Sequence, residues 1–330
     1  MVRIQAGVPI FVLNTHMTPH EYDVISVNVR IHRPATIASG FYDSVSSRLI
    51  EKLPVRTLTS YTYGSPIPDE LPTEIADIIR RSTGFQALII RNPDQKFILI
   101  EYTDGPSGTT GAIDTHAPHF LGAVVCQYDA LSTAYKSSPY QIVPGYFSRN
   151  METPLPPYTG TIDKLVFVGT VHPDVPERQA LLRLREHPDL TLVEGYVRRP
   201  DGANIRPVEY SHALSQYASH RAVLALRGTS YFCFREFDIL AGGYPLISHE
   251  LNYTSQMEPL VDDEHYFAVP FDPHPEVFAR RLIDKFNDVR GDTARLERVR
   301  RNGQAWFFRN ATWQGITDRL YEWTLRILSC

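Results

Sequence analysis

Short apolar runs separated by turn-forming residues recur along the first half of the chain, and most have the length of a β-strand. Residues 24–31 alternate apolar and polar side chains, and the runs at 87–90 and 97–102 are joined by a hairpin-like Asn-Pro-Asp-Gln turn. Residues 73–81 place isoleucines on one face and predict a short helix, whereas the turn-rich residues 35–70 are hard to assign. The strands expected in this half are residues 8–13, 24–31, 87–90, 97–102, 123–128 and 140–144.

The second half follows a more regular order, in which strands alternate with helices. Its strands are expected at residues 164–168, 190–193, 222–226, 244–248 and 265–270. Helices are expected to begin at Pro176 and Pro275, to follow an N-cap at Asp292, and to cover 211–219, 234–241 and 312–328. In the last of these, large apolar residues recur at steps of three and four and so share one face.

A proline-rich segment separates the two halves. Residues 151–160 contain three prolines, which favour an extended linker between domains. The chain has 330 residues, of which 43% are hydrophobic and 21% charged, and it is long enough for two hydrophobic cores. We therefore expect two α/β domains, residues 1–155 and 156–310, that meet at a cleft, followed by a last helix within 311–330.

The stretch 226–250 contains the most specific pattern in the chain. An apolar strand leads into a Gly-Thr-Ser turn, and a short helix then ends at two glycines before the next strand. This order makes half of a nucleotide-binding α/β unit. Because the N–H groups of such a turn and of a helix N-terminus suit a diphosphate, Gly228, Thr229 and Ser230 are candidate ligand-binding residues.

Three charged side chains lie close to this turn in the sequence. Arg227 and Arg235 could form forked contacts with phosphate. Asp238 lies one helical turn after Arg235, and a half-exposed carboxylate there could accept hydrogen bonds from both hydroxyls of a ribose. An Arg-x-x-Asp pair taken alone is more often a weak surface ion pair, but its place in the strand-turn-helix unit favours a ligand site.

The run Arg-Glu-Phe-Asp-Ile-Leu-Ala-Gly-Gly-Tyr-Pro-Leu-Ile, residues 235–247, resembles the donor-site signature of GT-B glycosyltransferases. In that signature an arginine precedes an acidic residue by three positions, and a small-residue turn, a proline and a strand follow. The exostosin-like and CAP10-like (protein O-glucosyltransferase) families are the most similar. Their acidic residue is usually glutamate, and Asp238 takes its place here. The similarity covers roughly the second half of the chain.

This resemblance extends to Gly169, which follows a strand, and to Arg178 in the next helix. In the family, such a glycine lets the backbone approach the donor phosphate, and such an arginine reaches the diphosphate. The resemblance implies the GT-B fold, with two Rossmann-like domains facing a central cleft, acceptor binding in the first domain and a C-terminal helix that crosses back to it. It also implies transfer of a sugar from a nucleotide-sugar donor, such as a UDP-sugar, to an acceptor hydroxyl, without a cofactor.

An inverting enzyme of this class also needs a base that takes the acceptor's proton. Asp104 follows a strand in a Gly-Pro turn and is the first candidate, with a turn-capping role as the alternative. His116 and His119, in a long loop rich in Gly, Thr and His, are the next candidates. The two histidines lack a third metal ligand nearby, which favours a polar loop over a zinc site. The resemblance to GT-B enzymes implies a reaction that is independent of metal.

Charge and cysteine content narrow the range of partners. A net charge of −4 argues against a general nucleic-acid or anionic-membrane surface. The three cysteines are widely spaced, and the chain contains neither an N-terminal apolar run nor a membrane-spanning stretch. These features predict a cytoplasmic enzyme of a bacterium, phage or virus.

The acceptor and the exact activity stay open at this point. A glycan, a protein and a hydroxymethylated DNA base are all candidate acceptors, and the oligomeric state is undefined. One alternative function is a nucleotide-sugar epimerase with the same two domains, which would act on the donor alone. Another is a non-catalytic sugar- or nucleotide-binding protein of the periplasmic type, against which the missing signal peptide argues.

Overall fold

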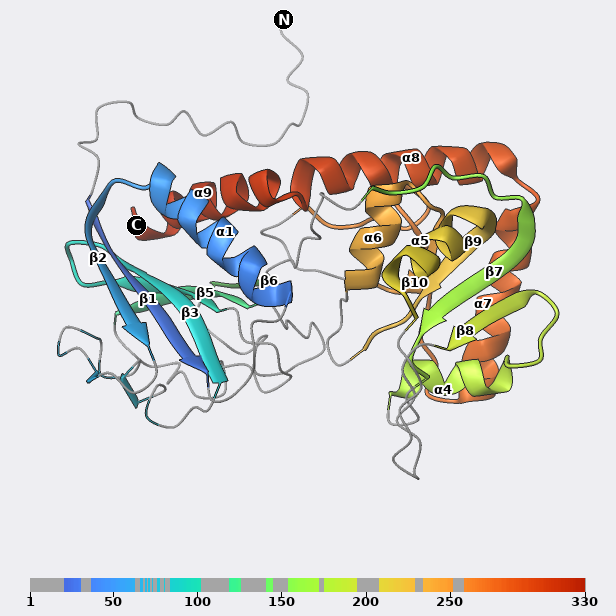
Figure 1. Cartoon of the computed structure of the whole chain (residues 1–330), viewed down its shortest axis with the longest axis horizontal. Coiled ribbons are helices and arrows are strands. Elements are labelled where there is room, and N and C mark those ends of the chain that lie inside the picture. Colours follow the sequence, from blue (N-terminus) through green and yellow to red (C-terminus); the bar gives the residue numbers. More distant parts are fainter. Residues whose placement is uncertain are drawn as a thin grey trace, which may run out of the picture.

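The computed structural model consists of two α/β halves that lie side by side and are joined along one side by the last helices of the chain (Figure 1). It describes residues 21–30, 37–62, 84–101, 119–125, 141–144, 154–171, 175–194, 208–228, 234–251 and 258–329, with scattered positions between 66 and 80. Each half contains its own sheet. The expected fold class, two Rossmann-like α/β units with a C-terminal helix that returns to the first, is confirmed.

The strands of the first half are β1 (Tyr22–Arg30), β2 (Val55–Thr62), β3 (Gly84–Arg91), β4 (Phe97–Glu101), β5 (Phe120–Val125) and β6 (Gln141–Pro144). They form one sheet in the order β2-β1-β3-β4-β5-β6, and only the pairs made by β3 are antiparallel. The expected hairpin joins β3 and β4, and its turn is closed by two bonds between Asn92 and Lys96, at 2.9 and 3.0 Å.

Helices α1 (Ile37–Lys52) and α9 (Trp313–Leu328) pack together on one face of this sheet. Val45 and Leu49 of α1 are buried in the same apolar cluster as Leu320 and Trp323 of α9. Residues 35–70, which the sequence left unassigned, contain both α1 and β2. The glycine and four serines of α1 obscure its apolar face in the sequence.

Two other expectations for the first half concern short segments. Within the helix expected at 73–81, the four described positions are helical: Thr73, Ala76, Asp77 and Arg80. The strand expected at 8–13 lies outside the described residues.

The second half contains a fully parallel sheet in the order β11-β10-β9-β7-β8. Its strands are β7 (Ile162–Gly169), β8 (Leu190–Glu194), β9 (His220–Ala225), β10 (Leu246–His249) and β11 (Phe267–Val269). Its helices are α4 (Pro176–Arg183), α5 (Tyr210–Ser219), α6 (Phe234–Gly242), α7 (Pro275–Arg290) and α8 (Thr293–Asn310). All expected strands and helices of this half are present.

Helices cover both faces of the second sheet, which explains why the buried parts of its strands, such as residues 165–168 and 222–225, are continuous apolar runs. One apolar cluster joins one face to α5, α6 and α8, and a second cluster joins the other face to α4 and α7. The first cluster continues through Trp306 and Phe307 of α8 into α9 and the first sheet. The two halves therefore share one continuous core at the crossing from α8 to α9.

Local contacts agree with the predicted start of α8 and show where the described part of the proline-rich segment lies. Asp292 accepts a hydrogen bond from the Arg295 amide at 2.9 Å, as an N-cap does. The described part of the linker, 154–160, lies against the second half, where the Tyr244 hydroxyl donates to the Pro156 carbonyl at 2.7 Å. The exact domain boundaries stay a prediction.

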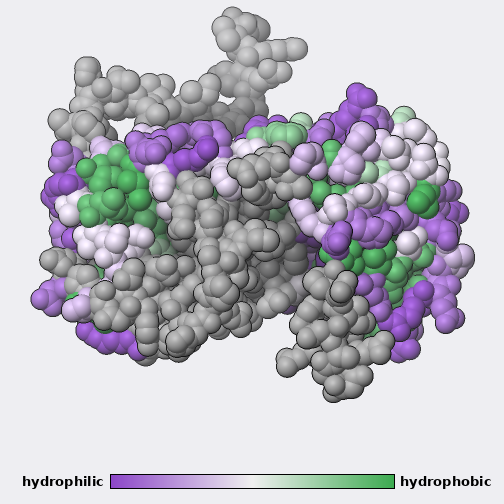
Figure 2. Space-filling view, in the orientation of Figure 1, coloured by the Kyte–Doolittle hydropathy of each residue, from purple (hydrophilic) through white to green (hydrophobic). Residues whose placement is uncertain are grey.

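The described surface alternates between polar and apolar areas. Figure 2 shows apolar patches on both halves of one face, set among hydrophilic residues. Within the ranges given above, no helix has both the length and the apolar character needed to cross a membrane.

Candidate functional site

The carboxyl ends of β7, β9 and β10 form the edge of the second sheet at which α6 begins. Ligands of open α/β sheets bind at this edge. The arrowheads of β1, β2 and β7 all point to the lower side of Figure 1, so the corresponding strand ends of the two halves lie on the same side of the molecule.

Arg235, the second residue of α6, extends over the end of β7. Its Nε donates to the Val168 carbonyl at 2.9 Å and its Nη1 to the Leu226 carbonyl at 3.4 Å. The guanidinium carbon lies 4.7 Å from the centre of the Phe167 ring, a favourable cation–π distance. Glycine at position 169 allows Arg235 to lie here, because a Cβ at that position would overlap Nη2 of Arg235. Its φ of +155° is also one that residues with a side chain rarely adopt.

Arg178 of α4 reaches the same strand ends from another side. Its Nη1 donates to the Thr170 carbonyl at 2.8 Å, and its Nη2 to the Leu226 carbonyl at 3.4 Å. Arg178 is 6% exposed, and its guanidinium carbon lies 5.8 Å from the centre of the Phe167 ring. Two cationic side chains predicted from distant segments therefore converge on one carbonyl, that of Leu226.

Asp238 lies deeper in the protein than expected. It is 7% exposed, so the expectation of a half-exposed carboxylate is wrong. The helix side that carries it is covered by α5, from which the Tyr210 hydroxyl donates to Asp238 Oδ1 at 2.6 Å. Burial raises the pKa of the neighbouring Tyr217 to about 12, with Arg235 lowering this pKa and Asp238 raising it. A neutral tyrosine thus accompanies the arginine and the carboxylate.

The remaining predicted residues of this edge divide into two groups. Arg227 contacts Glu177 of α4, with 3.7 Å between Nη1 and Oε1, and Gly228 follows it at the end of the described segment. The other two residues of the turn, Thr229 and Ser230, lie outside the described residues.

Three polar residues of this edge were given no role from the sequence. Glu236 is fully buried in the first turn of α6, where the helix dipole favours a carboxylate. At the end of β10, Ser248 Oγ donates to the Ala225 carbonyl at 2.8 Å and lies 3.2 Å from His249 Nδ1. Both Ser248 and His249 are buried. A polar Ser-His pair that ends a buried apolar strand is a signal that could have identified them.

Among the candidate bases, only His119 belongs to the described residues, and Asp104 and His116 lie outside them. The His119 carbonyl accepts a hydrogen bond from the Phe97 amide at 2.8 Å. Since Phe97 and Phe120 begin β4 and β5, this bond places His119 at the amino edge of the first sheet. Asp104 follows the carboxyl end of β4, Glu101, by three positions in the sequence.

A group of charged side chains around Asp23 occupies the amino edge of the first sheet. Asp23 of β1 accepts two hydrogen bonds from Arg56, at 3.1 and 2.7 Å, and one from Arg91 at 3.1 Å. The Arg56 bonds are the main cause of a pKa of Asp23 below its ordinary value. Within the described ranges, no group of three His, Cys, Asp or Glu residues is arranged to hold a metal ion.

Comparison with known proteins gives matches in structure alone. No family profile and no curated protein matches the chain in sequence. A glycosyltransferase from Rickettsia africae is 11% identical with a TM-score of 0.49, covering 93% of this chain and 99% of that one. A sucrose-phosphate synthase from Thermosynechococcus elongatus is 13% identical with a TM-score of 0.45, covering 63% of this chain. The chain spans 58% of the length of that synthase.

A further similar structure is the pneumococcal O-GlcNAc transferase in complex with UDP and GlcNAc. It is 14% identical with a TM-score of 0.41, and the match covers 66% of this chain and 47% of that one.

Proposed function

We propose that the protein is a glycosyltransferase that moves a sugar from a nucleotide-sugar donor to an acceptor hydroxyl. The observation that carries the proposal is the convergence of Arg178 and Arg235 on the carboxyl ends of β7 and β9, beside the start of α6. Such an edge with helix N–H groups and guanidinium groups suits a diphosphate. The signature of residues 235–247 supports the same assignment.

In this proposal the arginines stabilise the leaving diphosphate. The bond between the sugar's anomeric carbon and the diphosphate oxygen breaks, and a bond to the acceptor oxygen forms. Negative charge grows on the diphosphate in the transition state, so guanidinium groups that are already fixed in place lower the barrier. Backbone hydrogen bonds and the Phe167 ring fix Arg235 in this way.

Asp238 is proposed to bind the ribose of the donor. Tyr210 occupies one position on Oδ1 and thereby orients the carboxylate. A carboxylate has about four lone-pair positions, so hydroxyls of a ribose can bond to the same group. Burial holds the pKa of Tyr217 at about 12, so this side chain stays neutral beside Arg235 and Asp238 even in alkaline solution.

We infer that Asp104 is the base that accepts the acceptor's proton if the reaction inverts the anomeric centre. It follows the carboxyl end of β4, which is the ligand-binding edge of such a sheet. His119 belongs to the opposite, amino edge and is the weaker candidate. Four further parts of the proposal rest on the sequence alone. They are membership of the exostosin-like or CAP10-like families, a UDP-sugar as the donor, a reaction independent of metal, and a cytoplasmic location.

A thermal-shift screen tests the proposal. Nucleoside diphosphates and nucleotide sugars with different bases are added to the protein, with nucleosides as controls. A ligand at about 100 times its Kd stabilises the folded state by about 2.7 kcal/mol, which raises the Tm. At least one diphosphate is expected to do so and its nucleoside is not. No shift with any diphosphate, or release of an epimer from the donor alone, would refute the proposal.

A further inference from the structure

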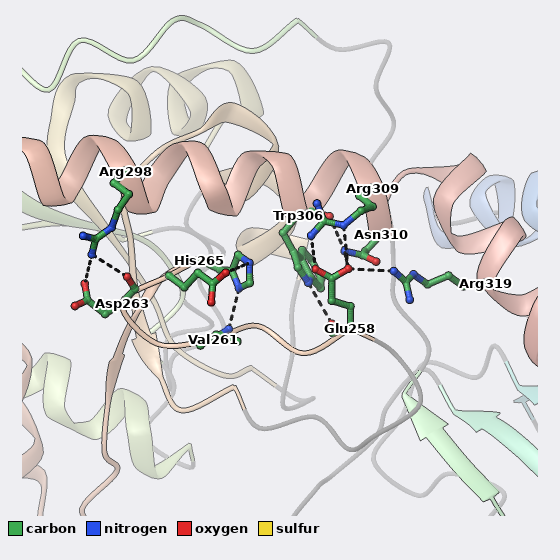
Figure 3. A network of polar contacts seen from close by, with 10 residues as sticks. Glu258, Val261, Asp263, His265, Arg298, Trp306, Arg309, Asn310 and Arg319 are labelled. Atoms are coloured by element: carbon green, nitrogen blue, oxygen red, sulfur yellow. Dashed lines mark hydrogen bonds and ion pairs between the residues drawn. The ribbon is translucent and has the colours of Figure 1, made fainter. Parts of the chain in front are cut away.

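Glu258 lies in the segment between β10 and β11 and accepts hydrogen bonds from two helices (Figure 3). The side chains of Arg309 and Asn310 in the last turn of α8 donate to Oε2 at 2.9 and 3.1 Å. Arg319 of α9 donates to the same oxygen at 3.1 Å. The Glu258 carbonyl accepts from Trp306 Nε1, also at 3.1 Å. One residue is therefore bonded on both sides of the α8–α9 junction.

The junction itself is short and tightly packed. Only residues 311 and 312 separate α8 from α9. The Thr312 side chain caps α9 by accepting from the Gly315 amide at 3.0 Å. Gly315 also lets the two helices approach, because a Cβ there would lie 2.6 Å from the Arg309 carbonyl oxygen. The angle between the helices is thus sensitive to contacts at this point.

The helix after the junction belongs to the first half. The Asn92 side chain in the β3–β4 turn donates to the Leu328 carbonyl at the end of α9, at 3.1 Å. Near its start, Asp318 forms an ion pair with Lys52 of α1. α8 instead packs on α6 and α7 of the second half. A change of the α8–α9 angle would therefore move one half relative to the other.

The same segment begins at the candidate site. It leaves the carboxyl end of β10, where the Leu251 amide donates to the Tyr266 hydroxyl at 2.8 Å. Further along, the Arg298 side chain on α8 donates to the Asp263 carbonyl at 3.1 Å, and the Val261 amide donates to His265 Nδ1 at 3.0 Å. These bonds attach the segment to α8 and to itself, so the edge that carries His249 is connected to the crossing between the halves.

We propose that Glu258 is a positioning residue that fixes the angle between α8 and α9, and with it the position of the second half's site relative to the first half. Its carboxylate is one negative charge between Arg309 and Arg319, so replacing it leaves two positive side chains facing each other at the junction. Their repulsion favours other angles of the two helices.

Pulsed electron–electron distance measurements test this inference without any ligand. Spin labels are attached at Ser47→Cys on α1 and Asn287→Cys on α7, two exposed positions, in a protein whose three native cysteines are replaced by serine. Glu258→Gln is expected to broaden or shift the distance distribution. Glu297→Gln is the matched control, because it removes a carboxylate from α8 that pairs only along that helix with Arg300 and Arg301 among the contacts described.

Each outcome has a defined meaning. An unchanged distribution in Glu258→Gln, or an equal change in Glu297→Gln, would overturn the inference. If Glu258→Gln unfolds, Arg319→Gln is the second variant: it removes the bond from α9 to Glu258 and leaves the bonds of Arg309 and Asn310 in place, so a broadened or shifted distribution is expected and an unchanged one would overturn the inference. A purely stabilising role of Glu258 would lower the Tm and leave the distribution of the folded protein unchanged.

The consequence for catalysis rests on the proposed function. For a nucleotide sugar that binds in the thermal-shift screen, Glu258→Gln is expected to lower kcat for transfer or hydrolysis by about 10- to 100-fold, the effect of a small misplacement. KM for the donor is expected to change little, because Glu258 does not line the donor-binding edge. If the wild type binds no nucleotide, the proposed function fails while the distance measurement still decides the role of Glu258.

Discussion

Both halves place two arginines at one edge of a sheet, but at opposite edges and with different partners. In the first half, Arg56 and Arg91 bond to a carboxylate, that of Asp23, at the amino edge. In the second half, Arg178 and Arg235 bond to backbone carbonyls at the carboxyl edge. We attribute a stabilising role to the arginines around Asp23. We propose that the arginines at the carboxyl edge of the second sheet, where the sequence signature of residues 235–247 lies, bind an anionic ligand.

Removal of the Asp23 carboxylate should have the largest effect on folding. Asp23→Ala removes three charged hydrogen bonds that Arg56 and Arg91 make to one buried carboxylate, which is expected to cost about 2–3 kcal/mol in the free energy of unfolding. Urea denaturation measures this cost. Asp77→Ala, at an exposed ion pair with Arg80, should cost less than about 1 kcal/mol. A comparable loss in both variants would remove the distinction between the two groups of arginines.

The position of the Arg235 side chain should depend on Gly169, the small residue against which its guanidinium packs. Gly169→Ala places a Cβ against the guanidinium at a φ of +155°, so it should cost about 1–3 kcal/mol of stability and also weaken nucleotide binding. Gly291→Ala is the control, because nothing lies within 4 Å of its Cβ. Denaturation and calorimetry check the two properties. A Gly169→Ala protein with wild-type stability and affinity would contradict the packing described for Arg235.

Replacement of the Asp238 carboxylate should have a smaller effect on stability than the two changes above. Asp238→Asn should weaken nucleotide affinity by about 1–3 kcal/mol through the loss of a charged acceptor for ribose. It should also lower stability by up to about 1 kcal/mol, because the buried carboxylate accepts the Tyr210 hydroxyl. The test compares ribose and deoxyribose forms of the nucleotide. Equal discrimination by variant and wild type would refute the assignment of Asp238.

Of these changes, Tyr217→Phe should have the smallest effect on stability at neutral pH. Burial raises its pKa from 10.0 to about 12, so the folded state keeps its proton at pH values where the unfolded chain loses it. Its contribution to stability is complete below pH 10 and declines as the pH rises to about 12. Tyr217→Phe should abolish this part of the pH dependence in denaturation experiments. An identical alkaline slope in both proteins would show that Tyr217 is not the group responsible.

The two halves also differ in how far the sequence predicts them. The second sheet is covered on both faces, so its inner strands contain continuous apolar runs that are easy to recognise. Its helices carry N-terminal signals such as Asp292 and Pro275. In the first half, the serine-rich α1 lacks a clear apolar period and was missed. Its buried face becomes evident only through contact with α9, more than 250 residues later.

The sequence proposed the residues of the candidate site but not their partners. Arg235 and Asp238 came from the strand-turn-helix pattern, and Gly169 and Arg178 from the resemblance to GT-B glycosyltransferases; their binding roles stay predictions. The sequence could not show that Tyr210, 28 positions before Asp238, bonds to it and helps to bury it. Nor could it show that two arginines from different helices share the Leu226 carbonyl. Such contacts depend on how α4, α5 and α6 pack around the sheet.

The central claim is that the carboxyl edge of the second sheet binds a nucleoside diphosphate. Calorimetric titration of UDP, GDP and ADP into wild type, Arg235→Ala and Arg56→Ala tests it most directly. We predict that at least one of them binds the wild type, that Arg235→Ala weakens it by about 1.5–3 kcal/mol, the range for a charged hydrogen bond, and that Arg56→Ala leaves it unchanged. Equal affinity in wild type and Arg235→Ala, or no binding of any of the three, would contradict the account.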